Sequence, residues 1–221
     1  MRRETIVVLL LTALAVAWSA IGPREVATWW LEAAPVLIGA PLLAVTERRF
    51  PLTPLVLRCL FLHALVLLVG AHWTYAEVPL GNWVRDAFGL ARNHYDRLGH
   101  LAQGFVPALL MRELLLRRRV VSGRGWLLVV VTSIVLAFSA LYELLEWATA
   151  LAIGSAADAF LGTQGDPWDT QTDMFLALVG ALAAQLLLGR WHERQIAAVE
   201  RCSPLDLPSS QAPPSPPRSP A

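Results

Sequence analysis

Charged residues are scarce in this 221-residue chain, at 16% of the sequence, against about 25% in soluble domains. Hydrophobic residues make up 56%, and the mean hydropathy is +0.51. This balance indicates an integral membrane protein whose first partner is the lipid bilayer. The formal net charge is only +1, so we expect no nucleic-acid partner. Nothing in the sequence fixes an oligomeric state.

Cysteine and the common metal motifs are also nearly missing. Cys59 and Cys202 lie outside any CxxC or His-rich context, so we predict neither a zinc site at them nor a required disulfide. The sequence contains no HExxH motif, no internal repeat and no cofactor-binding motif. No segment alternates as a β-barrel strand does. Because backbone groups inside a bilayer must bond internally, helices remain as the spanning structure.

Long apolar stretches predict an all-α, polytopic integral membrane helical bundle with six transmembrane helices, since one span needs about 20 mostly apolar residues. The first stretch follows a basic "MRRET" segment, as in a signal peptide, but we expect it to be retained because five more spans follow. We treat residues 1–200 as one domain and 201–221 as a disordered, Pro/Ser-rich cytoplasmic tail. The expected spans are 5–21, 27–45, 55–76, 98–116, 125–149 and 171–189.

Arginine placement predicts the orientation. The positive-inside rule puts arginine-rich connections in the cytoplasm, and the 154–172 loop has no basic residue. Both termini should therefore be cytoplasmic, in a multi-pass protein of the bacterial inner membrane. Tryptophans fall at predicted span ends, as an interfacial belt requires. The arginines on the predicted inner side are Arg2, Arg3, Arg48, Arg49, Arg117 to Arg119, Arg124, Arg190, Arg194 and Arg201.

Polar residues collect near the outer ends of the last three spans. Asp96 and His100 are four residues apart and Gln103 is three further on, so they share one helix face. In "AFSALYELLEWATA", Glu143 and Glu146 also share a face. Polar residues within spans usually face the bundle interior, so we expect these faces to meet.

The acidic stretch "DAFLGTQGDPWDTQTDM" (158–174) leads into the last span. Asp166 before Pro167 predicts a helix N-cap with proline at the first helical position. Asp169 has capping-box spacing from Asp166, and Asp173 follows one turn later. The same face continues as small residues that allow close helix packing, namely Ala177, Gly180, Ala181 and Ala184.

Together these patterns predict one outer polar cluster. For a divalent metal the candidate ligands are His100, Glu143, Glu146 and Asp173. Helix capping by the aspartates and a rim ion pair of Arg97 with Asp96 or Asp173 are the plainer interpretations. The full candidate cluster is Asp96, Arg97, His100, Gln103, Glu143, Glu146, Asp169 and Asp173.

Other polar residues have plainer expected roles. Arg112 and Glu113 should snorkel at the cytoplasmic end. His63 is expected to pack between helices and His72 to lie at the interface. His192 shows no partner pattern, so we expect it to be solvated or interfacial.

Three classes of function remain open. The cluster could receive an envelope lipid head group or relay protons. It could hold a divalent metal in an enzyme that acts on a lipid-linked substrate. It could instead only tie helices together in a structural or accessory membrane protein. Metal content after purification would separate the second class from the third, and the sequence does not decide whether the chain is an enzyme.

Three long segments resemble the signatures of the YjdF-like bacterial inner-membrane family. The resemblance spans roughly 30–195 and implies a multi-span membrane fold, but no activity, because the function of that family is unknown. The segments are "HYDRLGHLAQGFVPALLMRELL", "LAFSALYELLEWATAL" and "DAFLGTQGDPWDTQTDMFLALVGALAAQLLL".

A more distant resemblance is to VanZ-like membrane proteins, which are linked to glycopeptide-antibiotic resistance. It rests on Asp96-Arg97-Leu98-Gly99-His100 followed by Glu143. Glu146-Trp147 and the paired acids Asp169 and Asp173 depart from that pattern, so the VanZ-like function is not carried over.

Overall fold

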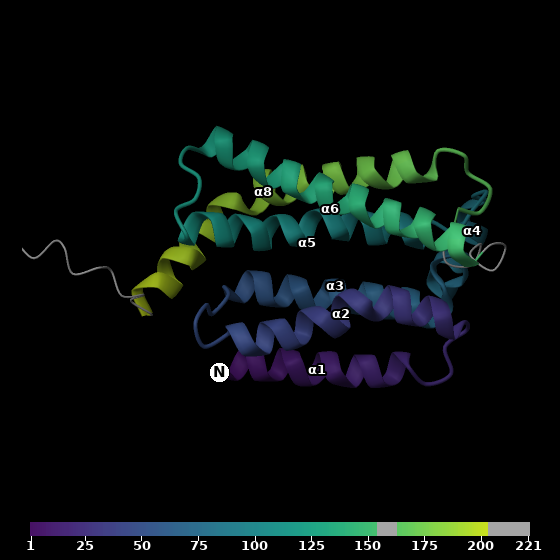
Figure 1. Ribbon diagram of the computed structural model, residues 1–221, viewed down its shortest axis with the longest axis horizontal. Helices are drawn as coiled ribbons and strands as arrows, with labels where there is room; N and C mark the ends of the chain where they lie inside the picture. The colour runs from purple at the N-terminus through teal and green to yellow at the C-terminus, as the bar shows by residue number, and fades with distance from the viewer. Residues whose placement is uncertain (154–162, 203–221) are drawn as a thin grey trace, which may run out of the picture.

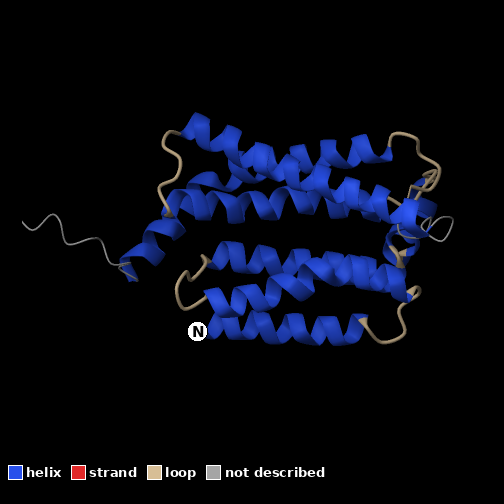
Figure 2. Ribbon diagram, viewed as in Figure 1, coloured by secondary structure: helices blue, strands red, loops and turns tan. Residues whose placement is uncertain are grey.

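The computed structural model describes residues 1–153 and 163–202, and within them every regular element is a helix (Figure 2). The predicted all-α class is therefore confirmed for this part of the chain. Residues 158–162 of the acidic stretch and 203–221 of the predicted tail lie outside the described residues. The elements are α1 (Arg3–Ser19), α2 (Val26–Thr46), α3 (Pro54–Trp73), η1 (Tyr75–Glu77), α4 (Pro79–Phe88), α5 (Tyr95–Arg117), α6 (Arg124–Ile153) and α8 (Asp169–Cys202).

The long helices run side by side in two groups (Figure 1). One group is α1, α2 and α3, and the other is α5, α6 and α8, with α3 packed against α5 between them. The N-terminus, the α2–α3 and α5–α6 connections and the end of α8 lie together at one end of the bundle. We call this end the arginine-rich end. The opposite end carries the α1–α2 connection, α4 and the start of α8.

The helices are built to face lipid. Four of them, α2, α3, α6 and α8, are long and apolar enough to cross a membrane. Large apolar side chains point outward while charged ones are buried, which is the reverse of a soluble protein. Examples of outward side chains are Leu14, Ile38, Val45, Leu62, Phe138, Leu151, Leu186 and Leu187, and examples of buried charged ones are Glu32, Glu47, Glu113 and Asp173.

The predicted boundaries needed two corrections. The connection between the expected spans 55–76 and 98–116 contains the short helix α4. It begins at Pro79 and ends at Phe88, followed by Gly89 in a left-handed conformation (φ 63°). Proline at the first position and glycine just after the last are typical helix boundaries, and the sequence prediction did not use either signal.

The last helix also runs well past residue 189, where its apolar run ends. The polar continuation stays helical because it packs against the bundle. His192 is fully buried, and the Gln195 side chain accepts a hydrogen bond from Leu55 N at 2.9 Å. That bond satisfies one of the free N–H groups at the start of α3. The sequence pattern detected the apolar span but not this polar extension.

Helices α5 and α8 form the closest contact in the bundle. Ala177, Ala181 and Ala184 have no exposed surface. A Cβ placed on Gly180 would overlap Leu101 O, and one on Gly104 would overlap the Ala177 backbone. The predicted small-residue face is thus confirmed. Its contact brings the start of α8 against the start of α5, which positions the polar residues of both.

Gly104→Ala should therefore destabilise the bundle. The added methyl would have to separate two backbones, and overpacking of this kind costs about 1–3 kcal/mol. Denaturant titration in detergent micelles would measure the loss. Gly39→Ala in α2 is the matched control, since a Cβ there meets nothing within 4 Å. An equal effect of the two substitutions would contradict the α5–α8 contact.

Candidate functional site

The first turns of α5 provide two of the central groups. Asn93 Oδ1 accepts a hydrogen bond from Tyr95 N at 3.0 Å, in the turn that leads into the helix after the His94 N-cap. Asp96 and His100 then lie one turn apart on the same face, 9% and 5% exposed. The Asp96 Oδ1 to His100 Nε2 distance is 3.5 Å.

Two other helices bring carboxylates to the same histidine. Asp173, one turn into α8, places Oδ2 at 3.9 Å from His100 Nε2. Glu143 on α6 places Oε1 at 3.7 Å from His100 Nδ1. The structure thus brings together one histidine and three carboxylates from three helices, all buried. We call Asp96, His100, Glu143 and Asp173 the acid–histidine cluster.

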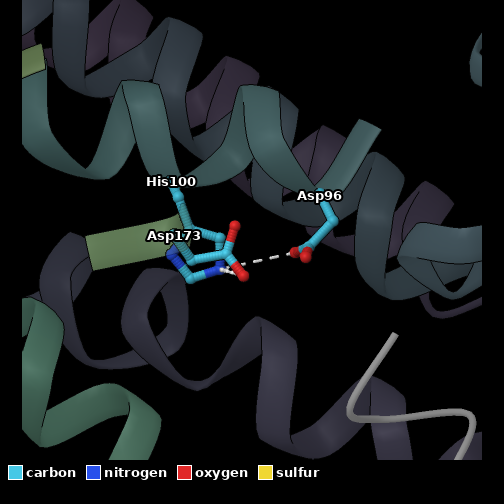
Figure 3. Close-up of side chains that lie close together, drawn as sticks. All are labelled: Asp96, His100 and Asp173. Carbon is cyan, nitrogen blue, oxygen red and sulfur yellow. Dashed lines mark ion pairs between the residues drawn. The ribbon is translucent and has the colours of Figure 1, made fainter. Parts of the chain in front are cut away.

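The two ring nitrogens of His100 face different carboxylates. Its Nε2 edge faces Asp96 and Asp173 (Figure 3), and one ligand atom from each of these three residues lies within 4.8 Å of the others. Its Nδ1 edge faces Glu143 alone among the three carboxylates. Within the described residues, the buried atoms His100 Nδ1, Glu143 Oε1 and Asp173 Oδ1 have no hydrogen-bond partner. Unsatisfied buried groups of this kind call for an ion, a water or a proton.

Arginines pair with the outer acids of the acidic stretch. Arg97 Nη2 donates to Asp166 Oδ2 at 2.7 Å, so the expected pairing of Arg97 with Asp96 or Asp173 is wrong. Arg92 forms a buried ion pair with Asp169. The two acids lie 69 and 77 residues beyond the arginines that they pair with, so spacing within one helix could not show these contacts.

The start of the last helix also differs from the prediction. Asp166 Oδ1 accepts from Trp168 N at 3.0 Å in a turn, and α8 begins at Asp169. Asp166 therefore caps the turn before the helix rather than the helix itself. Gln164 pairs both ways with the Asn93 backbone, at 2.9 Å and 2.8 Å, which ties the acidic stretch to the start of α5.

His94 lies beside these arginines and outside the acid–histidine cluster. Burial, with Arg97 and Arg92 nearby, lowers the pKa of His94. Its Nδ1 lies 3.2 Å from Arg97 Nη1, a contact that a neutral ring accepts. His94 is thus a neutral neighbour of the arginines at neutral pH, and His100 is the histidine among the acids.

Two residues of the predicted polar cluster form no hydrogen bond or ion pair with its other members among the described residues. Gln103 and Glu146 are half-buried, on α5 and α6 respectively. Neither forms a side-chain hydrogen bond or ion pair with residues 1–153 or 163–202. Glu146 still lies near enough to Glu143, Asp96 and His100 for their charges to act on it, so its place among the expected metal ligands stays a prediction.

Sequence reasoning missed Glu32, a carboxylate in the second turn of α2. It is 3% exposed and accepts a hydrogen bond from the Tyr142 hydroxyl at 3.1 Å. The Tyr142 ring in turn lies edge-on to His100, with ring centroids 6.5 Å apart. A lone carboxylate in an apolar span is itself a signal of function. In the segment "WWLEAAPVL", Glu32 is such a carboxylate. Arg92 was also missed. The only feature of the sequence that could have suggested its role is its position just before the polar face of α5.

A second buried network lies at the arginine-rich end. Glu113 is fully buried and accepts hydrogen bonds from Thr53 N at 2.9 Å and Arg117 Nη1 at 2.8 Å. His192 Nε2 lies 3.1 Å from its other oxygen. Arg112 is also buried and pairs with Glu193. The expected snorkelling of Arg112 and Glu113 and the expected solvated His192 are therefore wrong.

The acid–histidine cluster has the donor set of a divalent-cation site. Ligand atoms held about 2.0–2.2 Å from an ion stand about 3.0–3.6 Å from one another. The 3.5 Å separation of Asp96 from His100 Nε2 lies within this range, and the 3.9 Å separation of Asp173 lies slightly beyond it. Metal-bound histidines usually donate the other ring N–H to a carboxylate, and Glu143 lies where that partner belongs.

The comparisons with known proteins agree with this architecture. Residues 4–194 match the family described as "Predicted membrane protein (DUF2238)". The chain is 52% identical over 179 residues to "Inner membrane protein YjdF" of Escherichia coli (strain K12), covering 81% of this chain and 86% of that protein. No solved structure matches. The expected family and the inner-membrane location are thereby confirmed, and the chain belongs to the DUF2238 family of membrane proteins, together with YjdF.

Proposed function

We propose that this inner-membrane protein binds a divalent cation at the acid–histidine cluster, and that the cation receives the phosphate of an envelope lipid head group on the periplasmic side. One observation carries the proposal: Asp96, His100 and Asp173 bring a nitrogen and two carboxylate oxygens within 4.8 Å of one another in a buried site. Mixed imidazole and carboxylate ligands suit ions such as Zn²⁺ and Mn²⁺. Phosphate oxygens commonly complete such coordination.

Charge supports a cation there. His100 is the basic group that Asp96, Glu143 and Asp173 all face. Three carboxylates exceed the charge of one imidazolium, and burial makes the excess costly. A divalent ion bound to the neutral imidazole would lower the charge of the three carboxylates from −3 to −1. The metal-dependent enzyme left open by the sequence needs the same ion, so one binding experiment bears on both.

A structural role is the second candidate. The cluster joins α5, α6 and α8 through a single histidine, and interhelical polar contacts of this kind stabilise membrane bundles. In that case a proton rather than a metal offsets the excess charge. The two candidates differ in whether purified protein takes up an ion.

Mn²⁺ titration of the untagged protein in detergent tests the proposal, with free Mn²⁺ followed by electron paramagnetic resonance. We expect one tight site per chain. Asp173→Asn should weaken it by about 100-fold or more, because losing a supporting partner alone costs about 10–100-fold. The matched control is Asp86→Asn, an exposed aspartate on α4. Equal binding by all three proteins, or no tight site in the wild-type protein, would reject a metal site at the acid–histidine cluster.

The periplasmic placement rests on a six-span topology with both termini cytoplasmic. In support, the arginine-rich connections lie together at one end of the bundle (Figure 1), and such connections stay cytoplasmic. Reporter fusions after Phe50, Gly89, Gly123 and Arg201 should read in, out, in and in. A fusion after Arg201 that reads out would overturn the orientation.

A further inference from the structure

A cavity at the arginine-rich end is separate from the acid–histidine cluster. It has a volume of about 350 Å³ and lies among α5, α6 and α8, near the start of α6. Three arginines, Arg112, Arg124 and Arg190, line it together with Glu193. Counting three positive charges and one negative charge, the lining has a net charge of +2.

The arginines are arranged around a single acid. Glu193 pairs with Arg112 and also lies 3.3 Å from Arg124 Nη2. Arg190 is exposed and forms no ion pair with the described part of the chain. Arg112 is 6% exposed, and its Nε atom has no hydrogen-bond partner within the described residues. A buried, only partly satisfied guanidinium next to a cavity points to an anion, because a phosphate accepts from the arginine fork.

Apart from Gln185, the rest of the lining is apolar or glycine, and it is open at the exposed Leu186. Leu128 and Leu186 contribute to it, and Leu186 is 71% exposed. Two glycines leave the space, since Gly125 and Gly189 add no side chain. A Cβ on Gly125 would meet nothing within 4 Å. Basic groups beside an apolar surface at one membrane face match a phospholipid, with an anionic head and a hydrocarbon chain.

We propose that this cavity binds an anionic phospholipid, whose phosphate contacts Arg112, Arg124 and Arg190 and whose acyl chain lies against Leu128 and Leu186. The site lies at the end opposite the acid–histidine cluster and needs no metal. Basic pockets between membrane helices hold anionic head groups in this way.

Native mass spectrometry of the full chain tests the proposal, with phosphatidylglycerol and phosphatidylcholine added in the presence of EDTA. The chelator removes any lipid held through a metal at the other end. Wild-type protein should prefer phosphatidylglycerol. Arg124→Gln with Arg190→Gln should lower phosphatidylglycerol affinity by about 25-fold, from about 5-fold per arginine, and leave phosphatidylcholine unchanged.

Two comparisons make the result specific. Arg48→Gln with Arg49→Gln removes the same charge from exposed positions at the same end and should have little effect. Gly125→Leu should fill the cavity and reduce lipid binding with every charge in place. Equal loss in the Arg48/Arg49 control, or no phosphatidylglycerol preference in wild-type protein, would overturn the proposal. So would binding of inorganic phosphate as tight as that of the lipid.

Discussion

His100→Ala is expected to lower Zn²⁺ affinity by about 100-fold or more. The variant removes the only nitrogen ligand of the proposed site and the group that three carboxylates share. The remaining ligands would all be oxygens, which favour Mg²⁺, Ca²⁺ and Mn²⁺ over Zn²⁺. Mn²⁺ affinity should therefore fall less than Zn²⁺ affinity. Competition titration with a chromogenic chelator measures both ions.

Two further variants separate ligand loss from misfolding. Glu143→Gln keeps the shape of the side chain, and we expect a milder loss of about 10–100-fold, as for a partner that orients a ligand. His63→Ala removes a half-buried histidine from α3 and should leave Zn²⁺ binding unchanged. If His100→Ala folds normally and binds Zn²⁺ as the wild-type protein does, the site is not where we place it.

Glu113→Gln is expected to destabilise the protein by about 3–5 kcal/mol, because it breaks a buried ion pair and leaves a charge behind. The Arg117 side chain is 1% exposed and would lose its carboxylate partner. His192 and Thr53 contact the same carboxylate, so three segments would loosen together. Denaturant titration of the purified protein gives the change in unfolding free energy.

Glu200→Gln is the matched control, as an exposed glutamate near the end of α8, and should change stability by less than about 0.5 kcal/mol. A double variant of Glu113 and Arg117, both to glutamine, should cost clearly less than the sum of the single changes, since the pair interacts directly. Additive losses would show that Glu113 and Arg117 do not stabilise each other.

Apolar length and periodicity predicted the helices well, because both act locally. The expected spans 98–116 and 125–149 lie within α5 (Tyr95–Arg117) and α6 (Arg124–Ile153). The i, i+4 spacing of Asp96 and His100 and the place of Glu143 near the end of its span also sufficed to suggest that they meet. The polar face of a helix inside a bilayer almost always faces the bundle interior.

Contacts that depend on tertiary packing were not predictable in the same way. Arg97 pairs with Asp166 rather than with the nearby Asp96, because Gln164 and Asp166 lie against the start of α5. His192 lies beyond the apolar run, and its burial depends on Glu113, 79 residues earlier. Nothing in either local sequence indicates that pairing. Such long-range polar contacts need the helix arrangement first.

The buried polar groups also divide by chemistry. At the arginine-rich end, Glu113 is matched by Arg117 and His192, as expected for a network that holds helices together. In the acid–histidine cluster, acids outnumber the one basic group that they share. That imbalance is the physical reason to assign cation binding to one end and stability to the other.

Pulsed electron paramagnetic resonance of Mn²⁺-loaded protein, with histidine labelled by ¹⁵N, tests the central claim most directly. Coupling between the electron spin and a labelled nitrogen appears only when an imidazole nitrogen binds the ion. We predict that coupling in wild-type protein and in His63→Ala, and its loss in His100→Ala. Bound Mn²⁺ without nitrogen coupling, or coupling that survives in His100→Ala, would contradict a metal held by His100 with Asp96 and Asp173.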